Sequence, residues 1–583
     1  MVCVMPSIQN PPKIKEMGNL DIQNLKVSFH TREGIIHAVD GVDISIKPGE
    51  IIGLVGESGS GKSVTCNSIL QLLPTPPARI EAGKIDWSGK DLLKQHDKKI
   101  RGIRGKEISM IFQDPMSCLN PYLSVLDQVA EPLVIHGMAS PTNARKQAGE
   151  MLARVGVQRV VDHPHAYPHE FSGGMRQRAM IAMALVTKPS LLLADEPTTA
   201  LDVTVQAKVL NILKELCTDL GVSVLFVSHD LGLVAELADR VVVMYRGKVV
   251  EQNDTRSIFS NPQHPYVKAL IACRPTLESN PVRLPTVDDF MNPKTGKEQA
   301  LEKLELPSLN LDTQGTLLEV QDLVVEFPTE GDPVRAVDGA SLIIRKGSTH
   351  GLVGESGSGK TTLGRSILQL TKANSGKILY QGNAISLENI QDRTKFRKSM
   401  QIIFQDPYAS LNPRMTVEQA LLEPMKVHGL GKSRKDRIDR VVKLLEEVGL
   451  GEEYLNRYPH EFSGGQRQRI CVARALTTEP EFIVCDECVS AMDVSVQAQV
   501  LNLLRSLQAS RNLTYLFISH DLGVVKFMSD EISVMKNGKM VENGLAEDLY
   551  RNPKSIYTRK LIDSIPLANR SSNFRLNHPP PSL

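Results

Sequence analysis

The stretch GLVGESGSGKS, from Gly53 to Ser63, decides the fold, and it returns as GLVGESGSGKT from Gly351 to Thr361. Each copy follows a short apolar run and precedes a sequence typical of a helix, which is the context of a phosphate-binding loop. The glycines let backbone N–H groups approach phosphates, the lysine neutralises phosphate charge, and the final hydroxyl suits Mg²⁺. A tight turn with a solvated lysine is the alternative, but two complete copies in this context argue against it.

We assign the phosphate-binding role to the same positions of both loops. In the first half these are Gly56, Glu57, Ser58, Gly59, Ser60, Gly61, Lys62 and Ser63. In the second half these are Gly354, Glu355, Ser356, Gly357, Ser358, Gly359, Lys360 and Thr361. The hydroxyl groups of Ser63 and Thr361 are the expected ligands of Mg²⁺.

The two loops belong to an internal repeat that spans the chain of 583 residues. The motif IFQDP at Ile111 returns at Ile403, and YPHEFSGG at Tyr167 returns at Tyr458, in the same order and at a nearly constant offset. A repeat of this length predicts two domains. We place the first domain at 19–273, a proline-broken linker at 274–315, the second domain at 316–565, and a disordered tail at 566–583.

Within each half, short apolar runs alternate with helical patterns. Ile51–Val55, Leu191–Ala194 and Val224–Val227 read as buried parallel strands, and the pattern over Val203–Leu220 predicts a helix. This alternation predicts an α/β core in which the strand ends deliver loops to one edge, where a ligand binds.

An acidic pair ends one apolar run in each half. LLLADEP contains Asp195 and Glu196, and FIVCDEC contains Asp486 and Glu487. The first carboxylate of each pair suits Mg²⁺, and the second can act as general base for a water in line with the γ-phosphate. An acidic pair after a strand is common, so this assignment depends on its order behind the phosphate loop.

Composition excludes several classes of protein. Lys plus Arg number 68 and Asp plus Glu 66, so the net charge of +2 offers no field of one sign for a nucleic-acid backbone. No apolar run is long enough for a membrane span, and residues 1–17 do not resemble a signal peptide, so we expect a cytosolic chain. Eight cysteines suit a reducing compartment. Cys485 and Cys488 have redox or metal spacing, but two small residues packed beside a strand is the better explanation.

With these motifs in place, both halves resemble the nucleotide-binding domains of the ATP-binding-cassette family over nearly their whole length. The resemblance implies two tandem P-loop NTPase domains, each an α/β parallel-strand core with a helical signature subdomain. The segments FSGGMRQR and FSGGQRQR match the signature that completes the ATP site of the opposite half. The matching residues are Ser172, Gly173 and Gly174, and Ser463, Gly464, Gly465 and Gln466. Without the family, glycines before a helix indicate only an anion-friendly helix start.

Other roles also come from the resemblance. It implies that Gln113 and Gln405 touch Mg²⁺ and signal to a transmembrane partner, and that His229 and His520 contact the γ-phosphate and join Glu196 and Glu487 in catalysis. It assigns Asp202 and Asp493 to the loop that links the two sites, and it matches Phe29 and Phe327 to the adenine-stacking aromatic residue. A lone histidine after a strand is more often structural, and either phenylalanine fits a core position equally well.

The finer resemblance is to importers of dipeptides, oligopeptides, nickel and glutathione, with two ATPase subunits fused in one chain. It rests on AVDGV, GESGSGK, FQDPMSCLNP, FQDPYASLNP and YPHEFSGG, and on NPQHPY at Asn261 and NPKSIY at Asn552. That family's cysteine cluster is missing near Cys273, so we expect no iron–sulfur centre. The halves also differ at Met175 against Gln466, Pro197 against Cys488, and Leu201 against Met492. Because Lys62, Glu196 and His229 in one half and Lys360, Glu487 and His520 in the other are all present, we expect both sites to hydrolyse ATP, and the sequence leaves open whether they do so equally.

The resemblance therefore implies a transport ATPase that requires ATP and Mg²⁺. One ATP would be held between Lys62 and Ser463 and the other between Lys360 and Ser172, with the halves pairing within one chain. Two permease subunits and an extracytoplasmic substrate-binding protein would be the partners, at the cytoplasmic face of the inner membrane. The alternative is a twin-cassette ATPase that acts on ribosomes or DNA, although the short linker, near-zero charge and lack of zinc spacing disfavour it.

Overall fold

The computed structural model describes residues 18–31, 34–114, 118–198, 202–278, 281–292, 298, 315–328, 332–385, 390–490 and 492–566. It divides into two compact units. The first unit consists of Met1–Pro197, Val209–Ser228 and Leu237–Thr255, and the second of Thr198–Lys208, His229–Glu236 and Arg256–Leu583. Apart from Pro566, the expected tail lies outside the described residues.

The strands of the first half form two sheets. They are β1 (Leu20–Thr31), β2 (Gly34–Ile46), β3 (Ile51–Val55), β4 (Ala78–Trp87), β5 (Lys90–Asp91), β6 (Ile108–Ile111), β7 (Leu191–Asp195), β8 (Ser223–Ser228), β9 (Arg240–Tyr245) and β10 (Lys248–Asp254). One sheet has the order β2-β1-β4-β5 and is antiparallel, and the other has the order β10-β9-β3-β8-β7-β6. In the second sheet every neighbouring pair is parallel except β9 with β10. The predicted parallel core is therefore confirmed.

Burial explains why these short runs become strands. All residues of β3, β7 and β8 are buried, and their sequences IIGLV, LLLAD and SVLFVS are almost wholly apolar. A parallel strand covered on both faces needs such a continuous apolar run. Because β3 and β7 are parallel to β8, the phosphate loop after β3 and the acidic pair at the end of β7 meet at one edge of the sheet.

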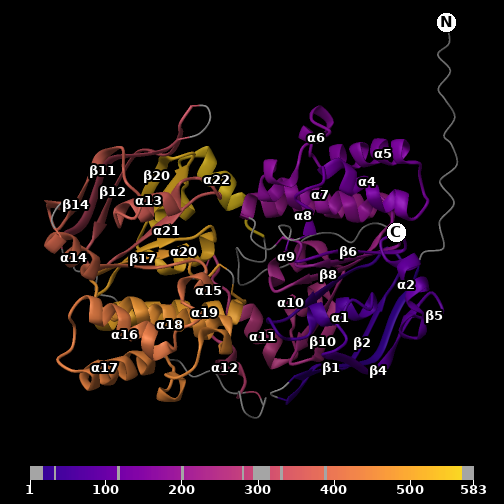
Figure 1. The fold of residues 1–583 in the computed structure, drawn as a ribbon, viewed down its shortest axis with the longest axis horizontal. Helices are drawn as coiled ribbons and strands as arrows, with labels where there is room; N and C mark the ends of the chain where they lie inside the picture. The colour runs from indigo at the N-terminus through magenta and orange to yellow at the C-terminus, as the bar shows by residue number, and fades with distance from the viewer. Residues whose placement is uncertain are drawn as a thin grey trace, which may run out of the picture. The chain divides into compact units, whose positions relative to one another are not determined.

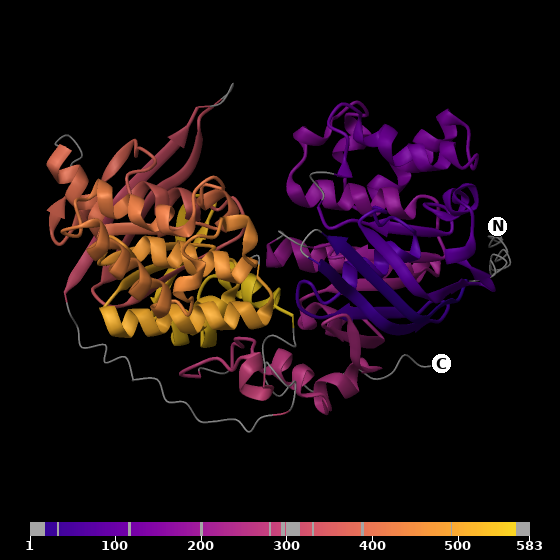
Figure 2. The same cartoon turned by 60° about the horizontal axis from the view of Figure 1, so that its bottom comes forward.

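Helices surround these sheets. In the first half they are α1 (Lys62–Ile69), α2 (Asp97–Ile103), α4 (Val125–Ile135), α5 (Pro141–Arg154), α6 (Arg159–Asp162), α7 (Gly173–Leu185), α8 (Val203–Leu220) and α9 (Leu231–Leu237). Figure 1 shows α4, α5 and α7 grouped in a helical layer on the far side of β6 and β8 from β1, β2 and β4. In Figure 2 the indigo strands of the antiparallel sheet lie beside one another at the front of this half. The expected helical subdomain is thus present.

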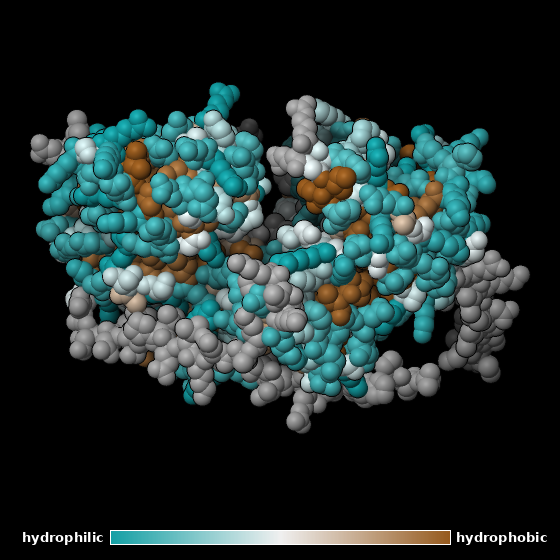
Figure 3. Space-filling view, turned by 90° about the horizontal axis from the view of Figure 1, so that it is seen from below, coloured by the Kyte–Doolittle hydropathy of each residue, from teal (hydrophilic) through white to brown (hydrophobic). Residues whose placement is uncertain are grey.

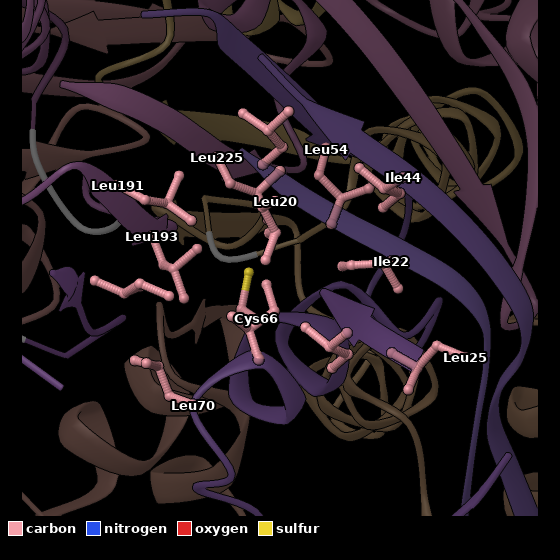
Figure 4. Close-up of a cluster of buried hydrophobic side chains, with 14 of the residues drawn as sticks. Leu20, Ile22, Leu25, Ile44, Leu54, Cys66, Leu70, Leu191, Leu193 and Leu225 are labelled. Atoms are coloured by element: carbon pink, nitrogen blue, oxygen red, sulfur yellow. The ribbon is translucent and has the colours of Figure 1, made fainter. Parts of the chain in front are cut away.

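One hydrophobic core joins the two sheets of the first half. Figure 4 shows Leu20, Ile22 and Ile44 of the antiparallel sheet converging with Leu54 and Leu193 of the parallel sheet around the Cys66 side chain of α1. All of these side chains are almost completely buried. Packing of this kind stabilises the fold by the free energy of removing apolar surface from water, and it holds α1 against the end of β3.

The second half repeats this architecture. Its strands are β11 (Thr316–Phe327), β12 (Val334–Arg345), β13 (Thr349–Val353), β14 (Ser375–Tyr380), β15 (Asn383–Ala384), β16 (Met400–Ile403), β17 (Phe482–Asp486), β18 (Thr514–Ile518), β19 (Glu531–Lys536) and β20 (Lys539–Leu545). The sheets have the orders β12-β11-β14-β15 and β16-β17-β18-β13-β19-β20. The strand β14 has 6 residues where β4 has 10, which is where most of the length difference between the halves falls.

The helices of the second half follow the same order. They are α13 (Lys360–Ile367), α14 (Ile390–Ser399), α15 (Pro407–Ser410), α16 (Val417–Val427), α17 (Arg434–Glu447), α18 (Gly464–Leu476), α19 (Val494–Arg511), α20 (Leu522–Met528), α21 (Ala546–Arg551) and α22 (Ile556–Asp563). In Figure 1, α16, α17 and α18 form the helical layer of this half, away from β11, β12 and β14.

Three short helices lie in the described residues between β10 and β11. They are α10 (Thr255–Ser260), α11 (Pro265–Ala272) and α12 (Val287–Phe290). Beyond them, the Asn502 side chain of α19 accepts from the backbone N–H of Leu284 at 2.9 Å and donates to its carbonyl oxygen at 2.8 Å. The predicted linker therefore includes residues that pack on the second half rather than only a flexible spacer.

None of the helices in the described part of the chain combines the length and the apolar character that a span requires. The face in Figure 3 is mostly hydrophilic, with separate small apolar patches.

Candidate functional sites

The phosphate loops keep their shape because their glycines approach other backbone atoms closely. Gly56 has φ +153°, and a Cβ on it would lie 2.2 Å from the Met244 carbonyl oxygen. Gly61 has φ +103°, and a Cβ on it would lie 2.4 Å from the Ala38 carbonyl oxygen. In the second half, Gly354 and Gly359 would place a Cβ 2.2 Å from the Met535 oxygen and 2.1 Å from the Ala336 oxygen. Only glycine fits such positions, so each loop is fixed by its sequence.

The lysine of each loop is buried and turned onto the loop itself. Lys62 Nζ donates to the carbonyl oxygens of Gly56 and Glu57, both at 2.8 Å. Lys360 Nζ donates to those of Gly354 and Glu355 at 2.8 and 2.9 Å. Burial lowers the pKa of Lys360, against the opposing effect of nearby carboxylates led by Glu487. A buried ammonium group at the centre of a backbone loop is well placed to bind an anion.

The residues present fit a nucleoside triphosphate with a divalent cation. A Cβ on Gly59 or Gly357 would meet nothing within 4 Å, so the middle of each loop borders open space. Ser63 Oγ donates to Asp195 Oδ1 at 3.0 Å, and Thr361 Oγ1 donates to Asp486 Oδ1 at 2.8 Å. A hydroxyl beside a carboxylate at the end of the loop is a donor set that suits Mg²⁺.

Burial changes the protonation of these aspartates. It raises the pKa of Asp195 and of Asp486, although the hydrogen bonds from Ser63 and Thr361 oppose the change. A neighbouring glutamate raises both values further. A cation at this place would favour the charged form of each aspartate, so its binding would offset the cost of keeping two neighbouring carboxylates charged in a buried site.

Each glutamate of the acidic pairs is held in an unusual backbone conformation. Glu196 has φ 47° and Glu487 has φ 48°, in the left-handed region that L residues rarely adopt. Their backbone N–H groups donate to Val227 at 3.1 Å and to Ile518 at 3.0 Å. Backbone strain of this kind concentrates at functional sites.

The glutamines after β6 and β16 reach these same glutamates. Gln113 Nε2 donates to Glu196 Oε2 at 3.0 Å, and Gln405 Nε2 donates to Glu487 Oε2 at 2.9 Å. The structure thus brings together the glutamine and the acidic residue that sequence reasoning singled out separately. In the second half His520 joins them, because its Nδ1 lies 3.4 Å from Glu487 Oε2.

The His520–Glu487 pair shifts the titration of both groups. Burial is the largest single effect on His520 and acts to lower its pKa, but the hydrogen bond and the charge of Glu487, together with the charge of Asp521, outweigh burial and raise the value. Burial acts to raise the pKa of Glu487, and His520 together with Lys360 outweighs that effect and lowers it. The charged form of the carboxylate is therefore favoured, as a general base requires. His229 occupies the equivalent place after β8.

The two signature segments begin helices, but their caps differ. Ser172 is the N-cap of α7 and accepts from the Met175 N–H at 3.4 Å, and Ser463 is the N-cap of α18 and accepts from the Gln466 N–H at 3.3 Å. Only Gln466 returns a bond, its Oε1 accepting from the Ser463 N–H at 3.1 Å. A Cβ on Gly173 would meet nothing within 4 Å, so this helix start borders open space. These helix starts can bind an anion.

Other predicted positions have simpler surroundings. Asp202 Oδ1 accepts from the Val205 N–H at 2.8 Å, and Asp493 is the N-cap of α19. Phe29 packs partly against the core of the first half, whereas Phe327 is 44% exposed. Of the two, Phe327 has the more accessible ring for stacking on a base.

Cys485 and Cys488 are both buried, and both are free thiols. The hydrogen bond between them and their burial raise the pKa of the Cys485 thiol. A buried thiol that resists ionisation reacts slowly, which favours the packing interpretation over a redox one. In the described part of the chain, no three His, Cys, Asp or Glu side chains are grouped to hold a metal ion.

One contact to the second loop was not expected from the sequence. The Glu355 N–H donates to the hydroxyl oxygen of Tyr557 at 3.2 Å, and Tyr557 belongs to α22 near the end of the second half. The motif NPKSIY ends on this tyrosine, but neither its spacing nor its composition indicates which loop it reaches.

Known proteins share both this repeat and its C-terminal segments. The family described as ABC transporter matches residues 39–199 and 337–490, and the family described as oligopeptide/dipeptide transporter, C-terminal region, matches 250–294 and 541–582. A peptidoglycan transport ATP-binding protein, YejF, of Agrobacterium fabrum is 46% identical, over 93% of this chain and 95% of the relative. The glutathione import ATP-binding protein GsiA of Escherichia coli is 42% identical, over 95% and 91%.

The chain belongs to the ABC transporter family, and it is an ATP-binding ATPase subunit with two cassettes. Its C-terminal segments further match those of the oligopeptide and dipeptide transporters. A solved cassette dimer in a post-hydrolysis state, MJ0796 with ADP and Pi, aligns with 40% of this chain and 99% of that chain at 25% identity and a TM-score of 0.37.

Proposed function

We propose that this chain supplies the energy for an importer of short peptides. The observation that carries the proposal is the pair of segments, residues 250–294 and 541–582, that match the C-terminal region of oligopeptide and dipeptide transporters. The names of the two relatives refer to peptidoglycan transport and to glutathione import. Peptidoglycan and glutathione both contain short peptides. A short peptide is therefore the substrate class that all of these observations share.

In this proposal ATP is bound at two composite sites, with Mg²⁺. Lys62 with Ser463 would form one site, and Lys360 with Ser172 the other. The Mg²⁺ ligands would be Ser63, Gln113 and Asp195 in the first half, and Thr361, Gln405 and Asp486 in the second. The ion would neutralise phosphate charge during hydrolysis. Glu196 and Glu487 would accept the proton of the attacking water, and His229 and His520 would contact the γ-phosphate.

The partners would be two permease subunits, and a substrate-binding protein would deliver the peptide from outside. The chain would then lie at the cytoplasmic face of the inner membrane, and its two halves would pair within one molecule. An exposed apolar residue at the same repeat position supports a docking role for the helical layers. Ile135, at the end of α4, is 70% exposed, and Val427, at the end of α16, is 71% exposed. A single exposed apolar residue is common on protein surfaces, so the support comes from its recurrence at the same position of both halves.

Copurification tests the proposal. The tagged chain is purified from mildly extracted membranes of its own host, and we expect two multi-spanning proteins to accompany it. The variant Ile135→Asp with Val427→Asp should lose these partners while the purified chain keeps its ATPase activity. Ribosomes or DNA-repair proteins in place of permeases would refute the transport role and leave the ATPase intact.

A further inference from the structure

The last helix of the second half is fixed beside the phosphate loop. Ser555 is the N-cap of α22, and its hydroxyl accepts from the Tyr557 N–H at 3.2 Å. Glu542 of β20 accepts from the N–H groups of Lys554 at 2.8 Å and Ser555 at 3.0 Å. These bonds attach the start of α22 to the sheet, so the direction of its first turn is determined.

From this first turn, Tyr557 reaches the loop. Its hydroxyl oxygen accepts from the Glu355 N–H at 3.2 Å, and the hydroxyl is also hydrogen-bonded to the Glu355 carboxyl group. The Lys536 ammonium group, at the end of β19, lies 4.7 Å from the centre of the tyrosine ring. Burial raises the pKa of Tyr557 to about 12, so the hydroxyl keeps its proton at neutral pH.

The bond holds one particular peptide group. The Gly354–Glu355 peptide presents its carbonyl oxygen to Lys360 Nζ at 2.8 Å and its N–H to Tyr557 at 3.2 Å. Gly354 has φ +157° and is packed so closely that a Cβ would lie 2.2 Å from the Met535 oxygen. The peptide is therefore held from both sides in a conformation that a non-glycine residue could not adopt.

ATP binding would affect the bond from Lys360 and the bond to Tyr557 differently. For Lys360 to bind phosphate oxygens, its ammonium group must give up at least part of its bonding to the loop carbonyls. The Tyr557 bond uses the opposite end of the peptide and needs no change. It is then the side-chain bond that still restrains this peptide.

We propose that Tyr557 is a positioning residue of the second ATP site, which keeps the Gly354–Glu355 peptide in its binding conformation when Lys360 turns to the phosphates. This inference rests on the proposed role of Lys360 in binding ATP. Tyr557 does not touch the nucleotide, and it acts through the loop backbone. Because it belongs to the C-terminal segment shared with peptide transporters, it also links that segment to the ATP site.

Fluorescent ATP binding to the full chain tests this role. In a Lys62→Ala background, in which only the second site binds, Tyr557→Phe removes the hydroxyl and keeps the ring over Lys536. We expect the Kd for ATP, and the KM for hydrolysis, to rise about fivefold, because the variant loses the bonds of the hydroxyl to Glu355, with kcat nearly unchanged. Tyr550→Phe is the matched control, because Tyr550 Oη donates to the Leu522 carbonyl oxygen at 2.6 Å within the same C-terminal segment.

The outcomes separate the two proposals. Equal ATP affinity in Tyr557→Phe and Tyr550→Phe, at unchanged melting temperature, would overturn the positioning role. A loss of affinity that Tyr550→Phe reproduces would also overturn it, since general destabilisation would then be the cause. Adding Lys360→Ala should abolish the remaining binding, and if binding persists the ATP-binding role of the second loop itself is wrong.

Discussion

The two halves agree closely at the residues that we propose to act on ATP, and they differ in what surrounds these residues. The glutamine-to-glutamate bond measures 3.0 Å in the first half and 2.9 Å in the second, and both glutamates have nearly the same positive φ. In contrast, the first half has a ten-residue β4 ending in buried Trp87, while the shorter β14 ends in half-buried Tyr380. The comparison indicates that the bonds between the glutamines and glutamates are duplicated, whereas the packing at the end of the antiparallel sheet is not.

The largest effect should come from the shared residues. Changing Glu196→Gln together with Glu487→Gln should lower ATP turnover by about a hundredfold or more, because each glutamine keeps a hydrogen-bond acceptor but cannot take a proton. Steady-state ATPase assays of both single variants then measure the share of each half. The melting temperature serves as control for folding and should change only slightly, through the loss of the charge paired with His520. Full turnover in the double variant would contradict the assignment of both glutamates.

The next comparison concerns the aromatic residue at the end of the antiparallel sheet. Trp87 is 2% exposed and its Nε1 donates to Glu107 at 2.9 Å, whereas Tyr380 is only partly buried. Trp87→Ala should therefore lower the free energy of unfolding by about 3–5 kcal/mol, and Tyr380→Ala by less. Calorimetry of the full chain measures the unfolding free energy of each half, and it tests whether Trp87→Ala costs more than Tyr380→Ala. Equal losses would show that the halves are supported alike.

A buried histidine in the second half should make its stability depend on pH. His350 occupies the place of Ile52, and its Nε2 lies 2.9 Å from Ser533 Oγ, where the first half has Val242. Burial lowers the pKa of His350 to about 4, with the Glu531 carboxylate 3.9 Å away too distant to offset it. The unfolded chain then binds more protons between pH 6.5 and 4, so stability falls as the pH falls through this range.

The change should amount to about 2 kcal/mol between pH 7 and pH 5. Urea unfolding of wild type and of His350→Ile with Ser533→Val measures it, since the double variant reproduces the pair found in the first half. The variant should lose this part of the pH dependence. If both proteins respond equally to acid, His350 is not the group responsible.

The smallest effect concerns the signature helices. Met175→Gln should add the reciprocal bond that Gln466 makes to Ser463 in the other half, and it should stabilise the start of α7 by about 0.5 kcal/mol. A rise in melting temperature of about 1–2 °C is expected. Gln466→Met is the reverse experiment and should lower it by a similar amount. Shifts of the same sign in both variants would argue against the capping explanation.

Sequence reasoning located most of the fold, and the structure brings several of the predicted site residues together. The apolar runs at β3, β7 and β8 are strands with nearly the predicted bounds, and the helix predicted over Val203–Leu220 is α8. For the segment after residue 274, the sequence predicted a linker but not its contact with the second half, because Leu284 and Asn502 are 218 positions apart in sequence. Local patterns reveal a polar, proline-rich stretch, but they contain no information about the surface on which it packs.

The sequence by itself determined the two phosphate loops, the acidic pairs and the parallel strands that carry them. These features are local, since glycine spacing and apolar periodicity act within a few residues. Tertiary structure alone decided that Gln113 bonds Glu196, that His350 is buried beside Ser533, and that Tyr557 reaches Glu355 from 202 positions away. Such contacts depend on how packed elements place side chains from distant parts of the chain, and packing is satisfied only when the whole core has formed.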